Sequence, residues 1–124
     1  MASYANSNPA LVVDHAPFFA SGSLTDGNSA TVTFDNLTEQ IIVSCGTAGA
    51  GGVLRVGVTA AGVASTENIG LITAMTTGAL DVRLKQLVIK ADGATCTYQV
   101  FAVLSRLASG TYPDITTANG FAGV

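Results

Sequence analysis

The sequence predicts an α+β fold in which strands come first and helices close the chain. The clearest strand is expected over 79–90, where Leu80, Val82 and Leu84 alternate with charged residues, the period of a strand with one dry face. Turn formers follow at 91–93. Beyond them, apolar residues recur at the spacing of one helical face. Those residues are Val100, Phe101, Leu104, Leu107 and Ala108.

The N-terminal half is predicted to form strands joined by turns. Residues 1–9 are small and polar and are expected to be an arm. Phe18–Leu24 and Ala30–Phe34 flank a run of turn formers, which predicts a β-hairpin. Thr38–Cys45 and Val53–Thr59 are predicted to be the next two strands.

The later connections differ in character. Residues 46–52 are rich in glycine, but no Lys follows and the next element is a strand, so we interpret them as a hairpin tip and not as a phosphate loop. Residues 60–78 form a long connection of small residues with a short strand around Ile69–Ile72. Loops of this length are usually functional or variable in conformation. The apolar parity of the 79–90 strand changes after Lys85, which predicts a bulge near Gln86.

The range Tyr98–Ala108 decides the fold class. Tyr, Val and Phe favour sheets, so a strand is the rival prediction. We expect a helix because Gly110 and Pro113 stand where a helix stops, and a threonine at 95 or 97 can cap its start. Pro113 can also begin a further helical turn over 114–118.

Composition indicates one domain, for which burial in an assembly is one explanation of the low charge. The chain has 124 residues, of which 48% are hydrophobic and only 10% are charged, so the whole length is expected to fold as a single unit. The net charge is −3, which disfavours nucleic-acid binding, although all five basic residues lie between 55 and 106. We expect no signal peptide, because the first residues lack its basic and apolar regions, and no membrane-spanning segment, because no apolar run is long enough. Synthesis in the cytoplasm is expected.

No catalytic pattern is recognisable, so we expect no enzyme, no cofactor and no metal site. The single histidine, His15, has no orienting partner pattern. Cys45 and Cys96 are about fifty residues apart and lack any CxxC spacing. They are interpreted as two reduced, buried thiols. The alternative is a disulfide between the two cysteines, or between subunits, formed in an oxidising environment.

The order of elements resembles that of the coat proteins of single-stranded RNA bacteriophages, the levivirus-like family. The resemblance is carried by the predicted strand, tip and strand of Ile41–Val58, the long loop at 60–78, the strand from Leu80, and the predicted helix after Cys96. It extends through the tail 112–120, whose sequence is YPDITTANG.

This resemblance implies a fold and a function. The implied fold is an N-terminal hairpin, a five-stranded antiparallel sheet and two C-terminal helices, within 97–124, that pack on a dimer partner. The implied function is a capsid protein that forms homodimers, assembles into an icosahedral shell in the virion and packages single-stranded RNA, with 60–78 contacting neighbouring subunits. Dimer-interface candidates on the predicted helix are Val100, Phe101, Leu104 and Leu107.

The polar face of the sheet is expected to point toward the RNA genome. Its candidates are Gln40, Ser44, Arg55, Thr59, Arg83 and Lys85. An ordinary solvated face explains these residues equally well, and the family's RNA-facing sheet is usually richer in Lys and Arg.

Two other classes of protein fit the composition. A phage head-decoration or jelly-roll structural protein would bind a preformed capsid and would have a strand at Tyr98–Arg106. A carbohydrate-binding β-sandwich is disfavoured because the chain has no Trp and only three Tyr to stack on sugars.

Overall fold

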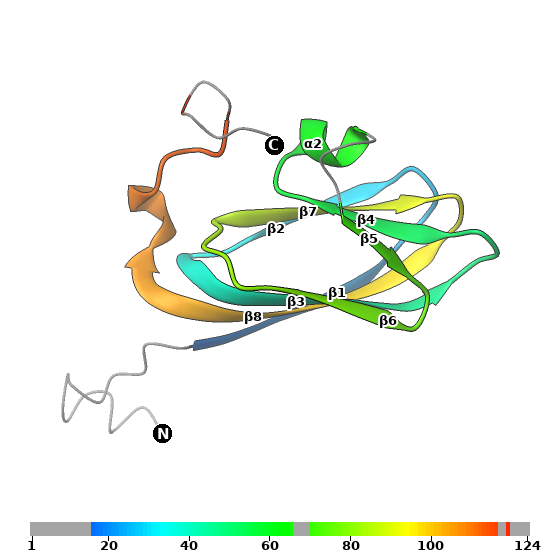
Figure 1. Cartoon of the computed structure of the whole chain (residues 1–124), viewed down its shortest axis with the longest axis horizontal. Helices are drawn as coiled ribbons and strands as arrows, with labels where there is room; N and C mark the ends of the chain where they lie inside the picture. The colour runs from blue at the N-terminus through cyan, green and yellow to red at the C-terminus, as the bar shows by residue number, and fades with distance from the viewer. Residues whose placement is uncertain (1–15, 66–69, 117–118, 120–124) are drawn as a thin grey trace.

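The computed structural model describes residues 16–65, 70–116 and 119, and this part of the protein is mostly β (Figure 1). The predicted arm at 1–9, His15, and residues 66–69, 117–118 and 120–124 lie outside it. The strands are β1 (Ala16–Leu24), β2 (Ser29–Thr33), β3 (Asn36–Ala48), β4 (Val53–Gly57), β5 (Gly70–Thr73), β6 (Thr76–Leu80), β7 (Gln86–Asp92) and β8 (Cys96–Ala108). The helices are α2 (Ala60–Ala64) and the 3₁₀ turn η2 (Ser109–Thr111).

The strands form two four-stranded antiparallel sheets. Sheet A has the order β1-β8-β3-β6 and sheet B the order β2-β7-β4-β5. The antiparallel pairs are nested in the sequence: β1 pairs with β8, β2 with β7, β3 with β6 and β4 with β5. The first four strands thus form one arm and the last four the other arm of a long hairpin that is rolled into two sheets. This is the strand order of an eight-stranded jelly roll.

Figure 1 shows the two sheets stacked as layers, and the core of buried side chains lies between them. Ile41 and Val100 from sheet A and Leu54, Leu87 and Ile89 from sheet B are at most 1% exposed. Burying each such side chain contributes about 1.5–3 kcal/mol. The two sheets are therefore held together by apolar packing.

The prediction of an α+β fold with two C-terminal helices is wrong. The range predicted as a helix is β8, a strand of 13 residues between β1 and β3. Val100 and Leu104 are four residues apart, a spacing that keeps two residues on one face of a helix and also on one face of a strand. In β8 Val100 faces the core, where it is 1% exposed, with Leu104 packed against the same cluster.

The predicted five-stranded sheet and the predicted hairpins are also wrong. β1 and β2 occupy their predicted positions but pair with β8 and β7, so their loop crosses from one sheet to the other. β3 and β4 are likewise in different sheets. The predicted long strand over 79–90 is two strands, β6 in sheet A and β7 in sheet B, and residues 81–85 cross between the sheets.

The long connection at 60–78 contains regular structure. It holds α2, β5 and most of β6, and β5 agrees with the short strand predicted there. β5 and β6 lie in different sheets and are joined at Met75, whose φ is 62°. Within the described part of the tail, 112–116 is not helical, so the helical turn predicted from Asp114 is wrong over those residues.

Candidate functional site: an uncovered sheet face

The outer faces of the two sheets differ in what lies over them. Helix α2 lies on the sheet B side of the sandwich (Figure 1) and contacts β4 and β7. Thr59 caps this helix by accepting a hydrogen bond from the Gly62 N–H at 2.8 Å. A Cβ on Gly57 would lie 3.2 Å from the Val63 backbone nitrogen, so the glycine lets α2 approach the sheet. Val63 is consequently only 2% exposed.

Sheet A has no comparable cover among the described elements. Its outward side chains alternate with those of the core, and we call them the open face. They are Pro17, Phe19, Ser21 and Ser23 on β1, Thr97, Gln99, Phe101 and Val103 on β8, Gln40, Ile42 and Ser44 on β3, and Thr77 and Ala79 on β6. None of these residues carries a charge.

An apolar row crosses the open face from edge to edge. Phe19 pairs with Phe101, Phe101 with Ile42, and Ile42 with Ala79. The Phe19 and Phe101 rings have centroids 4.8 Å apart and are tilted by 45°. Phe19 is 74% exposed. The described part of the chain leaves this apolar row exposed, and an exposed apolar row is typical of an interaction site.

A polar row runs beside the apolar one. Ser21 pairs with Gln99, Gln99 with Ser44, and Ser44 with Thr77. The hydroxyls of Ser44 and Thr77 are 3.0 Å apart and hydrogen-bonded. The open face is therefore apolar along one line and neutral but hydrogen-bonding along the next.

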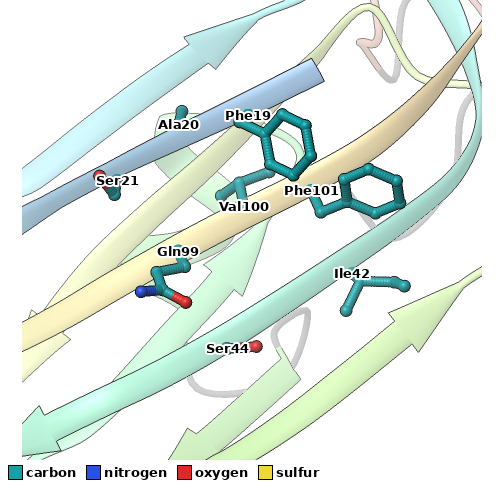
Figure 2. Close-up of a pocket in the computed structure, with 8 residues that line it drawn as sticks. All are labelled: Phe19, Ala20, Ser21, Ile42, Ser44, Gln99, Val100 and Phe101. Atoms are coloured by element: carbon teal, nitrogen blue, oxygen red, sulfur yellow. The ribbon is translucent and has the colours of Figure 1, made fainter. Parts of the chain in front are cut away.

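A hollow of about 440 Å³ lies between these rows. Figure 2 shows the two phenyl rings side by side, with Gln99 on the same strand as Phe101 and with Ile42 and Ser44 on the next strand. The lining contains no acid, base or thiol, so its chemistry is that of contact and hydrogen bonding.

The RNA-facing candidates do not gather on one surface of the described protein. Gln40 and Ser44 belong to the open face, whereas Arg55 lies on β4 in sheet B. Thr59 caps α2. RNA contact by these residues stays a prediction.

The three cationic candidates each have a carboxylate nearby. Arg55 is 2.9 Å from Asp92 and also donates to the Ser65 carbonyl at 2.9 Å. Lys85 is 3.0 Å from Asp114, and the Arg83–Glu39 pair is looser at 4.0 Å. Each local charge is thus partly balanced within the fold.

The four dimer-interface candidates are divided between the two sides of β8. Val100 is in the core and Leu104 packs against it, while Phe101 belongs to the open face and Leu107 is 51% exposed. Sequence reasoning missed Phe19 and Ile42. The available signal was the adjacent apolar pairs Phe18–Phe19 and Ile41–Ile42, since two apolar neighbours on a strand place one on each face.

The cysteines are free and buried. Cys45 lies on β3 and Cys96 on β8, both pointing into the core. Burial raises the pKa of the Cys45 thiol above its usual range, and the neighbouring Cys96 adds to the rise. Within the described ranges, no three His, Cys, Asp or Glu residues lie together in a way that could hold a metal ion.

The chain matches no protein-family model and no curated protein. Among the described residues, no helix is long and apolar enough to cross a membrane.

Proposed function

We propose that this chain is a jelly-roll structural protein of a virus particle. The observation that carries the proposal is the nested pairing of β1 with β8 through β4 with β5. Jelly rolls with this order serve as viral capsid domains, lectin domains and cupins. Fold alone does not select among these functions, so the choice depends on the surface.

The surface favours assembly. The open face exposes an apolar row on a chain with only 10% charged residues. Burial of this face against another protein removes apolar area from water and contributes about 25 cal/mol per Å². A structural subunit gains stability from such a contact, and it needs none of the convergent acids and bases that an active site requires.

A carbohydrate-binding function has weaker support. The exposed ring pair Phe19–Phe101 lies beside Gln99, but the rings are tilted by 45° and so do not form one flat stacking platform. The hollow also has no acidic residue or Arg, the side chains that hold paired sugar hydroxyls most strongly.

The resemblance to single-stranded RNA phage coat proteins loses its structural basis. That family's C-terminal helices would occupy the range that forms β8. The proposal includes two kinds of jelly-roll protein. A coat protein forms the shell itself, whereas a head-decoration protein forms discrete oligomers and binds a shell made by another protein.

The test is to express the chain alone and examine it by size exclusion and electron microscopy. Closed shells or regular capsomers larger than a dimer are expected for a coat-type or decorating protein. A protein that never exceeds a dimer at any concentration or salt contradicts the proposal. Glycan binding that is abolished by Phe19→Ser would replace it with a carbohydrate-binding function.

RNA packaging is tested separately in any shells that form. Replacing Arg55, Arg83 and Lys85 together with Gln is expected to lower the nucleic-acid content of the particles, because phosphate contacts depend on cationic side chains. Unchanged content removes these three residues from the RNA-facing surface.

A further inference from the structure

We infer that the open face is the contact between two copies of this chain, paired by a two-fold axis that runs along the strands between β8 and β3. This goes beyond the proposed function, because the pairing does not depend on whether the assembly is a virus particle. The charge and shape of the open face and the register of its four strands favour this pairing.

Charge favours a second copy as the occupant. Each chain carries a net charge of −3, and a contact through surfaces without charge brings no like charges directly together. The open face is such a surface, since all its side chains are neutral. The outer face of sheet B, in contrast, carries the Arg55–Asp92 ion pair and Lys90. A partner that binds through charged side chains would therefore dock on the outer face of sheet B.

Shape favours the particular axis. The bulky end of the apolar row is the Phe19–Phe101 pair on β1 and β8, and the low end is Ile42 and Ala79 on β3 and β6. A two-fold axis along the strands places β1 over the partner's β6 and β8 over the partner's β3. In an isologous contact this happens twice. Large side chains then meet small ones, the alternation that fills space between packed layers.

The polar rows match under the same operation. Gln99 on β8 lies over the partner's Ser44, and Ser21 on β1 lies over the partner's Thr77, by the register that sets the apolar row. Hydroxyls and an amide can each donate and accept hydrogen bonds. Apolar therefore meets apolar and polar meets polar.

The size of the face sets the expected strength. The open face spans 17–23 on β1, 97–103 on β8, 40–44 on β3 and 77–79 on β6. With strands about 4.8 Å apart and about 3.3 Å per residue, it covers roughly 350 Å² in projection. Pairing two such faces falls at the low end of specific interfaces. We therefore expect a dimer that dissociates on dilution. Because no charge holds it, raising the salt from about 0.05 to about 0.5 M should not weaken it.

Sedimentation over a range of concentrations tests this pairing in the full chain. Phe19→Glu and Ser21→Lys each place a charge on the open face and should weaken the dimer at least about tenfold. Both residues are exposed, so circular dichroism should remain that of the parent. Leu71→Glu is the matched control, because Leu71 is also exposed and apolar, at 62%, but lies on β5 outside the open face. It should leave the dimer unchanged.

A second substitution tests the axis. Phe19 faces the partner's Ala79, so adding Ala79→Lys to Phe19→Glu should restore dimerisation by pairing opposite charges twice. A strictly monomeric parent protein, or folded Phe19→Glu and Ser21→Lys variants that dimerise like the parent, would overturn the inference. Loss of the dimer in both single variants without rescue in the double variant would overturn the axis. If particles form and neither Phe19→Glu nor Ser21→Lys disrupts any oligomer, the proposed function is supported and this interface is refuted.

Discussion

Thr38 and Leu84 are joined by two hydrogen bonds. The Thr38 backbone N–H donates to the Leu84 carbonyl at 3.1 Å, and the Thr38 hydroxyl accepts from the Leu84 N–H at 2.9 Å. The same hydroxyl donates to the Val82 carbonyl at 2.6 Å. Thr38 is completely buried. It fastens β3 to the segment that crosses from sheet A to sheet B.

Thr38→Val replaces only a hydroxyl by a methyl group, but it should strongly destabilise the folded protein. It leaves the Leu84 N–H and the Val82 carbonyl without their side-chain partner in a dry site, which costs about 1–3 kcal/mol. Urea unfolding measures this loss. Thr77→Val makes the same substitution at an exposed position and should change the free energy of unfolding by less than about 0.5 kcal/mol. Equal effects of the two changes would contradict the role given to Thr38.

Gly93 is expected to resist substitution for two reasons. Its φ is +90°, and a Cβ would lie 2.7 Å from the Gly51 carbonyl oxygen. Gly93→Ala should lower the free energy of unfolding by about 1–3 kcal/mol, as measured by denaturant titration. Gly110→Ala is the control, since a Cβ there meets nothing within 4 Å, and it should be close to neutral. A neutral Gly93→Ala would show that the turn after β7 can rearrange.

Arg55 is expected to stabilise the helix that covers sheet B. Its guanidinium donates to Asp92 at 2.9 Å and to the Ser65 carbonyl at the end of α2, also at 2.9 Å. Only 18% of its side chain is exposed. Arg55→Met should destabilise the protein by about 1–3 kcal/mol, and hydrogen exchange should accelerate in α2 more than in β3. Uniform acceleration in both elements would mean that Arg55 supports the whole fold and not this helix in particular.

The raised pKa of Cys45 predicts a loss of stability in alkali. Its causes are first burial, then the charge and the hydrogen bond of the neighbouring Cys96. Because the folded state holds the thiol proton more tightly than the unfolded state does, this contribution is complete below the ordinary thiol pKa of about 8.5. It is lost as the pH rises through the folded value. Denaturant unfolding should show this decline above about pH 9, and Cys45→Ala should reduce it. Iodoacetamide should label Cys45 in the native protein only slowly, and a rapid reaction at neutral pH would contradict the burial argument.

Strand positions could be predicted from the sequence where one face is buried and the other is not. In β4, Leu54 and Val56 alternate with Arg55, and both apolar residues are buried. Of the turn predicted at 91–93, Gly93 lies in the turn after β7 with a positive φ, whereas Ala91 and Asp92 are the last residues of β7. The open face was harder to predict, since Phe19 and Ile42 became visible as a row only once β1, β8, β3 and β6 were placed side by side.

By itself, the sequence determined that the segments of β1 to β4 are extended and that turns separate them, because period 2 and turn chemistry are local properties. The tertiary structure decided which strands pair. β1 lies beside β8, about eighty positions away in the chain, and not beside β2. It also decided that 98–108 is a strand. The spacing of Val100 and Leu104 suits both a helix and a strand. The strand forms because β1 and β3 hydrogen-bond to the backbone of β8 on both sides and its inner face is buried in the core.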